Sequence, residues 1–223
     1  MALSSAITYM LDGIDLSTFG IHMSASDGVL DLPSLKQPQT YDWPDYHGVI
    51  VDLEKPRYNT RSLIFDAWVE TSEGMIDFAE RIRSFYDVIA KPGLHQLLSF
   101  NSPDRPFAFM VYMKDGMEVK KKWRDVQMYG TFKMKFEEPE PVKRVVRYTG
   151  DRASVSFSST DAFNIYWGDG TVDYDVVRPI QTPAGLDDTV THEYSSAGTY
   201  YICFSGNVDS LGSFSTNGTV IWE

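Results

Sequence analysis

Alternation of apolar and polar residues dominates this chain and predicts a mainly β protein. The pattern is clearest over residues 61–70 and 126–137, where nearly every other residue is apolar. Shorter apolar segments predict further strands at 7–11, 14–16, 49–53, 96–100, 107–113 and 118–123. Asp12-Gly13 and Lys114-Asp115-Gly116 have the composition of tight turns, so we expect the strands on either side of each turn to pair as a hairpin. A polar connection over 24–48 is long for a structureless loop, and such loops are usually functional or ordered by a neighbour.

One segment, at about 72–90, has helical periodicity. Thr71-Ser72 offers an N-cap, and Lys91-Pro92-Gly93 ends the pattern. We expect this amphipathic helix to cover one face of a sheet. Its predicted buried face recurs at three- and four-residue steps and consists of Met75, Phe78, Ile82, Phe85 and Ile89.

The chain has 223 residues, which suggests two domains. Residues 137–141 read Glu-Glu-Pro-Glu-Pro and interrupt the strand pattern, as a linker would. We therefore expect an α+β domain over 1–140, an antiparallel sandwich or barrel-like sheet with one helix. A linker over 141–147 and a small β domain over 148–223 follow.

The small domain carries a recognisable pattern. Trp167-Gly168-Asp169-Gly170 ends one alternating strand, and His192, Tyr194, Gly198 and Tyr200 form a His-x-Tyr and a Gly-x-Tyr pair further on. This combination resembles the PKD-type immunoglobulin-like β-sandwich, in which such residues are structural. The resemblance implies a module that binds or spaces other molecules. We expect Trp167 in the sandwich core, the alternative being an exposed platform for a sugar, and we expect His192 to hydrogen-bond the Gly-Asp-Gly turn, the alternative being a ligand or a base.

The larger domain resembles another family in the order of its elements and in four segments. These segments are 11–21, 27–33, 41–48, and 53–58, which leads into the strand with Phe65. Together they resemble the N-terminal domain of tail-tube-type phage proteins, in particular the distal tail (Dit-like) family. The resemblance implies a sandwich with a flanking helix that assembles into a six-fold ring around the genome channel, and it brings no catalytic residues.

A loop within the long connection is the candidate interface. Trp43, Asp45, Tyr46 and His47 concentrate aromatic and polar groups there, and aromatic residues at loop tips often anchor interfaces. Folding back onto its own sheet is the alternative. A second feature, the basic run at 120–124, has the composition of an edge strand protected by lysine, the alternative being a phosphate site.

The net charge of −11 is unevenly distributed, because residues 148–223 carry 10 acidic and only 2 basic side chains. Such a surface argues against specific nucleic-acid binding, which needs Lys and Arg to neutralise phosphates. Cys203 is the single cysteine, so no intrachain disulfide can form, and its apolar context predicts a buried thiol. The first seven residues lack the features of a signal peptide, and no window has the apolar length of a membrane span.

Candidate chemistry is sparse. Clustered carboxylates at Asp169, Asp173, Asp175, Asp187 and Asp188 suggest a calcium site, but their spacing does not match an EF-hand loop, and turn structure with solvated acids is the preferred interpretation. No nucleophile elbow, zinc-protease, P-loop or dinucleotide-binding motif occurs. We therefore expect no catalytic residue, metal or cofactor.

The function expected from the sequence is that of a structural virion component of a phage or prophage tail, assembled in the host cytoplasm. It would form a homo-oligomeric ring, as a hexamer, and contact other tail proteins through a projecting immunoglobulin-like module, with a host surface glycan as a further candidate partner. The alternative is a surface or secreted polysaccharide-binding protein with a PKD-like module.

Overall fold

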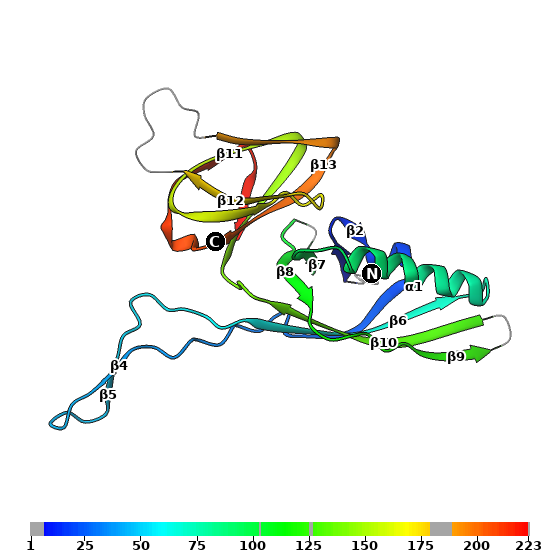
Figure 1. The fold of residues 1–223 in the computed structure, drawn as a ribbon, viewed down its shortest axis with the longest axis horizontal. Coiled ribbons are helices and arrows are strands. Elements are labelled where there is room, and N and C mark those ends of the chain that lie inside the picture. Colours follow the sequence, from blue (N-terminus) through cyan, green and yellow to red (C-terminus); the bar gives the residue numbers. More distant parts are fainter. Residues whose placement is uncertain (1–6, 103, 125–126, 179–188, 223) are drawn as a thin grey trace, which may run out of the picture.

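The computed structural model describes residues 7–102, 104–124, 127–178 and 189–222. The fold is mainly β, as the alternation predicts, with one α-helix in the described part of the chain. A front unit, a C-terminal unit and a long projecting arm can be followed in Figure 1. Three groups of residues used in the sequence predictions lie outside the described residues. They are Val126, the pair Asp187 and Asp188, and residues 1–6, where a signal peptide was not expected.

The front unit is an eight-stranded antiparallel sheet in the order β2-β1-β7-β8-β10-β6-β3, with β9 also paired to β10. Only two residue pairs, Phe136 with Met113 and Glu137 with Tyr112, join β8 to β10. Because this junction is short, the two halves of the sheet fold toward one another, and the Tyr9 and Phe65 rings meet edge-on at 5.4 Å. The elements are β1 (Thr8–Leu11), β2 (Ile14–Asp15), η1 (Leu16–Phe19), β3 (Ile21–Asp27), β6 (Arg61–Thr71), β7 (His95–Phe100), β8 (Phe107–Met113), β9 (Lys120–Arg124) and β10 (Gln127–Glu138).

The predicted helix is α1 (Met75–Ile89), and it covers the core between the two halves of the sheet. Its buried residues are Phe78, Ile82, Phe85 and Val88. Two details of the sequence prediction are wrong. Met75 is 40% exposed, and the N-cap is Gly74, because the Thr71 hydroxyl accepts a hydrogen bond from the Glu73 amide before the helix begins.

The hairpin expected between 107–113 and 118–123 does not form. β8 pairs with β7 instead, from His95 opposite Val111 to Ser99 opposite Phe107. β9 pairs with β10, with Lys122 opposite Tyr129. The apolar strand β8 takes an interior position, whereas the lysine-rich strand β9 takes an edge, where Lys120, Lys121 and Lys122 are exposed to water.

The connection over 24–48 also differs from the expected loop. β3 continues to Asp27, and β4 (Thr40–Asp42) pairs with β5 (Val49–Val51) at the far end of the arm. Gly28 lies between β3 and the arm with φ of 85°, and a Cβ atom there would lie 2.2 Å from the Ser62 carbonyl oxygen. Only glycine fits this close approach of the departing chain to β6.

The C-terminal unit begins earlier than the expected linker allows. β11 starts at Lys143, and Val145 and Val146 are fully buried on its two faces, so most of residues 141–147 are strand. β11 curves until its two ends flank β13, with Val145 on one side of Cys203 and Tyr166 on the other. The elements are β11 (Lys143–Tyr166), β12 (Val172–Arg178), β13 (Thr189–Gly206), η2 (Val208–Ser210), β14 (Leu211–Thr216) and β15 (Thr219–Trp222).

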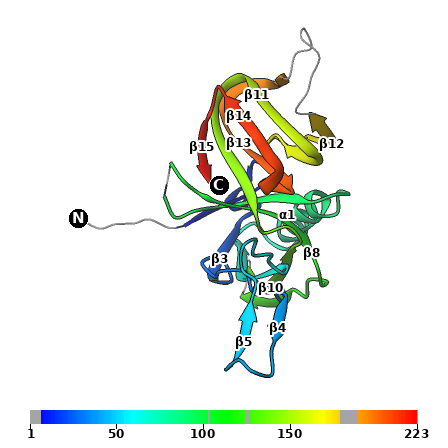
Figure 2. The ribbon, with the colours of Figure 1, turned by 90° about the vertical axis from the view of Figure 1, so that its left-hand side faces the viewer.

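A shared apolar layer, here called the seam, joins the two units. The Gln96 side-chain amide crosses it and donates to the Tyr201 carbonyl at 2.6 Å. The C-terminal unit is therefore seated on the outer face of β7 and β8, and it does not project from a flexible linker (Figure 2). The buried seam residues are Leu98, Ala108, Met110, Val145, Tyr166, Tyr201, Cys203 and Ile221.

Glu138, at the end of β10, has no exposed surface and lies where the two units meet. Its carboxylate forms ion pairs with Arg61 on β6 and with Lys143 on β11, and it accepts a hydrogen bond from the Met110 amide on β8. Four strands thus converge on one buried charge.

We predict that Glu138→Gln lowers the free energy of unfolding by about 3–5 kcal/mol, because Lys143 keeps a buried charge without its partner. Glu137→Gln is the matched control, since Glu137 pairs across the other face with the half-exposed Lys114. Urea unfolding of both variants, followed by circular dichroism, gives the comparison. Equal losses in the two variants would contradict the role assigned to Glu138.

Candidate assembly interface

The arm, defined here as residues 34–59, is an extended ribbon that leaves the front unit and returns to it. Backbone hydrogen bonds hold its two sides together along its length. At the base, the Asn59 amide donates to the Ser34 carbonyl at 2.8 Å, and further out the Asp52 amide donates to the Gln39 carbonyl at 2.9 Å. Figures 1 and 2 show β4 and β5 well away from the two units. An isolated two-stranded ribbon is marginally stable in water, so the arm gains from contact with another surface.

The predicted interface residues lie at the tip of this arm. Trp43, Asp45, Tyr46 and His47 are all exposed, and the Tyr46 amide closes a turn on the Trp43 carbonyl at 3.0 Å. The tip does not fold back onto its own sheet, which was the alternative interpretation of this loop.

Apolar side chains continue along the arm behind its tip. Each is at least 40% exposed, which is unusual for so many large apolar residues in one short segment. This set, with the tip aromatics included, consists of Leu35, Tyr41, Trp43, Tyr46, Val49, Ile50, Val51 and Leu53. Such a surface is typical of a segment that is covered in an assembly.

The base of the arm is tied to the C-terminal unit. Arg57 forms an ion pair with Asp209 of η2, although both side chains remain about half exposed. An exposed ion pair of this kind contributes little stability, so it marks a contact between the base of the arm and the C-terminal unit and not a strong link.

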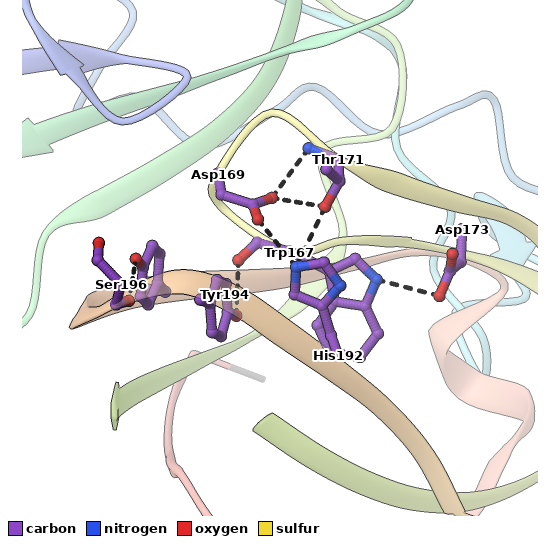
Figure 3. Close-up of polar contacts among 8 residues, drawn as sticks. Trp167, Asp169, Thr171, Asp173, His192, Tyr194 and Ser196 are labelled. Atoms are coloured by element: carbon purple, nitrogen blue, oxygen red, sulfur yellow. Dashed lines mark hydrogen bonds and ion pairs between the residues drawn. The ribbon is translucent and has the colours of Figure 1, made fainter. Parts of the chain in front are cut away.

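The Trp-Gly-Asp-Gly turn forms a compact cluster in the C-terminal unit (Figure 3). Trp167 is fully buried, its indole nitrogen donates to Asp173 at 3.0 Å, and its ring stacks on His192 at 4.8 Å. His192 Nε2 lies 2.8 Å from Oδ2 of Asp169, and the Thr171 amide donates to Oδ1 of the same carboxylate at 2.9 Å. The motif residues brought together here stabilise a turn.

The tyrosines of the motif complete the same cluster. The Tyr194 hydroxyl donates to the Trp167 carbonyl at 2.9 Å, and the Tyr194 ring stacks on Tyr200 at 3.6 Å. Tyr200 in turn donates to the Ser196 carbonyl at 2.8 Å. Gly198 lies opposite Gly150 in the β11–β13 ladder, next to the Tyr200 ring.

The Asp169 carboxyl group is held ionised by this arrangement. Burial by itself would raise the pKa of Asp169, but the hydrogen bonds from Thr171 and His192 outweigh it, and the pKa lies below its ordinary value. Its oxygens are therefore occupied by protein donors. Across the part of the chain that the structure describes, no three His, Cys, Asp or Glu side chains converge as a metal site requires.

Two further groups with chemical potential are buried. Burial raises the pKa of the Cys203 thiol to about 11, so the thiol is protonated at neutral pH and is a poor nucleophile. His95 contacts Asp12 with 2.7 Å between Nδ1 and Oδ2, and this hydrogen bond raises the pKa of His95 although burial opposes it. His95 follows Pro92-Gly93 and belongs to no motif, so the sequence carries no signal that would mark it as a site residue.

Comparison with known proteins adds little at the level of sequence. No protein-family model matches the chain, and no curated protein matches it. Among solved structures, the chain is similar to the Dit protein (gp 19.1) of SPP1, described as a paradigm of the hub adsorption apparatus in phages that infect Gram-positive hosts. The TM-score is 0.46 and the identity 13%, over 96% of this chain and 84% of the other. Within the described residues, no helix has the length and apolar character needed to cross a membrane.

We predict that Gly168→Ala destabilises the protein more than Gly170→Ala. Both glycines have φ of 88°, which costs a residue with a side chain about 1–2 kcal/mol. A Cβ at Gly168 would also lie 2.8 Å from the Tyr201 carbonyl oxygen, whereas the space around Gly170 is open. The free energies of unfolding in urea provide the measurement, and an equal loss at both positions would show that the turn does not press on β13.

We also predict a pH-dependent contribution from His95. Because its pKa is raised in the folded state, its stabilising effect is complete below the ordinary histidine value of about 6.5 and is lost as the pH rises through the raised value. His95→Gln should therefore lower the melting temperature more at about pH 5.5 than at about pH 8. His47→Gln, at the exposed arm tip, is the control and should change neither value.

Proposed function

We propose that this chain is a structural component of a phage or prophage tail, and that it self-associates through its arm into a closed ring. The observation that carries the proposal is the exposed apolar arm. Copies that cover each other's arms remove this surface from water, at about 25 cal/mol for each Å² of apolar area. The tail assignment comes from the resemblance of segments 11–21, 27–33, 41–48 and 53–58 to the distal-tail family.

The free edges of the front unit support association between copies. Among the strands that the structure describes, β3 is the last of the sheet and pairs only with β6. An unpaired strand edge is a template for another chain, and closed rotational assembly covers it. The proposed number of six copies in the ring follows from the family resemblance.

The charge distribution is compatible with a ring that surrounds a genome. The chain has a net charge of −11, so the assembled surface would repel a polyanion and let DNA pass without binding to it. In this proposal the protein has no catalytic activity, cofactor or metal, and it resides in the virion tail after assembly in the host cytoplasm.

The C-terminal unit, proposed to be PKD-like and immunoglobulin-like, would present its acidic outer surface to other tail proteins. A host surface glycan remains the second candidate ligand. Tyr174 favours it, because this side chain is 58% exposed beside a groove shared by Asp12, Lys91 and Thr171. A polysaccharide-binding surface protein is the corresponding alternative function, and binding of the full chain on a glycan array, combined with a monomeric state, would favour it.

We predict that the purified protein forms rings visible by negative-stain electron microscopy and that Trp43→Ala with Tyr46→Ala abolishes them. The double variant should remain a folded monomer with the circular dichroism spectrum of the wild type, because the arm tip contacts neither unit. Tyr174→Ala is the matched control, with nearly the same exposure on another surface. Multi-angle light scattering over a range of concentrations measures the assembly, and a strictly monomeric wild-type chain would contradict the proposed function.

A further inference from the structure

We infer that a neutral saccharide binds in a groove to which both units contribute, here called the shared groove. Its volume is about 530 Å³, within the range of about 300–1,000 Å³ that small-molecule sites occupy. The inference rests on the proposed glycan ligand of the C-terminal unit, and it adds where that glycan binds and which chemistry recognises it. The lining residues on which the argument depends are Asp12, Lys91, Gln96, Asp169 and Tyr174.

Turns from the two units meet at the shared groove. A Cβ atom at Gly13 of the front unit would lie 3.2 Å from the Gly168 carbonyl oxygen of the C-terminal unit. A Cβ atom at Gly93 would likewise lie 3.2 Å from the Tyr174 hydroxyl. Tyr174 therefore extends from β12 to the loop that follows α1, and a ligand beside it contacts both units.

The apolar seam holds these turns at their spacing. Tyr166 belongs to the seam, and Leu94 and Val172 pack against it, while all three also line the shared groove. Because the seam is formed within the folded chain, the groove exists before a ligand arrives. Binding to a preformed site avoids the entropic cost of ordering its walls.

Tyr174 supplies the aromatic surface of the shared groove. Its side chain is 58% exposed, whereas Tyr166, the other tyrosine of the groove, is buried. A pyranose ring has an apolar face of C–H groups, which packs on an aromatic ring while the hydroxyl groups at its rim form hydrogen bonds. Tyrosine suits such a ligand because it combines an apolar ring with a polar hydroxyl.

Hydrogen-bonding groups with unused capacity lie in the same groove. Asp12 accepts hydrogen bonds from His95 and from the Gln96 amide, two of about four that a carboxylate can accept. The buried side-chain oxygen of Gln96 has no hydrogen-bond donor among the described residues. Lys91 is exposed and forms no ion pair with any residue that the structure describes. Saccharide hydroxyl groups both donate and accept, so they match this mixture of acceptors and one donor.

The charges around the shared groove favour a neutral ligand. Asp12 and Asp169 each lie beside a histidine, at 2.7 and 2.8 Å, so the two carboxylates and Lys91 leave no strong positive field. Residues 148–223 carry 10 acidic and only 2 basic side chains. An acidic saccharide would be repelled by this surface.

The first experiment tests binding and its chemistry with the full chain. A glycan array presents neutral and acidic oligosaccharides, including lactose and sialyllactose, which differ by one acidic sugar. We expect neutral glycans to bind and sialyllactose to bind more weakly than lactose. Binding to acidic glycans alone would overturn the inference, as would an array without any bound glycan.

The second experiment locates the site by isothermal titration calorimetry with the neutral oligosaccharide that the array binds most strongly. Tyr174→Ala and Lys91→Ala should each weaken binding about tenfold, because the first removes the ring surface and the second a charged hydrogen-bond donor. Tyr86→Ala is the matched control, since Tyr86 is 38% exposed on α1 and does not line the groove. All three variants should keep the circular dichroism spectrum of the wild type, because each changed side chain is exposed.

The outcomes separate this inference from the proposed structural role. Weaker binding in Tyr174→Ala with wild-type binding in Lys91→Ala would overturn the shared groove, because the C-terminal unit would then bind the glycan by itself. Rings without glycan binding would overturn the inference and leave the structural role in place. Loss of binding in both groove variants, with wild-type binding in Tyr86→Ala, would support it.

Discussion

Burial of both faces of strands β7 and β8 is the constraint on which the rest of the structure depends. On one face, residues such as Leu97 and Phe109 enter the core under α1, and on the other, Leu98 and Met110 enter the seam. A sheet with two apolar faces needs a cover on each of them. The C-terminal unit supplies the second cover, so it completes the front unit and is not an independent attachment. The buried carboxylate of Glu138 then fixes the strands at the point where the chain passes from one unit to the other.

This constraint determines which surfaces remain for other molecules. With the β7 and β8 faces covered, the largest group of exposed apolar side chains that are close in sequence lies on the arm. The arm is carried by a body in which residues 143–147 belong to strand β11, and the Arg57–Asp209 ion pair links the base of the arm to the C-terminal unit. In the proposed ring, a constant direction of the arm would keep the contact between neighbouring copies the same around the whole ring.

Much of the front unit could be predicted from the sequence, because its longest elements have unambiguous periodicity. The strand over 61–70 and the buried face of the helix are where the pattern puts them, with Phe65 and Phe85 in the core. The pairing of β8 with β7 could not be read from a local turn signal, since the burial of β8 on both faces determined it. A continuous apolar run such as 107–113 is the sequence signal for such a strand. The same effect explains why 141–147 is not a linker, because Val145 and Val146 have separate apolar partners on the two faces of β11.

The candidate interface shows the same division between local and long-range information. Aromatic residues crowded into a polar loop, as at Trp43 and Tyr46, can be recognised from the sequence alone, because the chain gains nothing from placing them in water. The surface that covers them cannot, because any such surface is built from residues that are distant in sequence and come together only in the fold. The Lys120–Lys122 run is also ambiguous by itself, since lysine protects a free edge and attracts an acidic partner through the same charge. The structure shows one difference: Lys133 and Lys135 on β10 form ion pairs within the protomer, whereas Lys120, Lys121 and Lys122 form none with the residues that the structure describes.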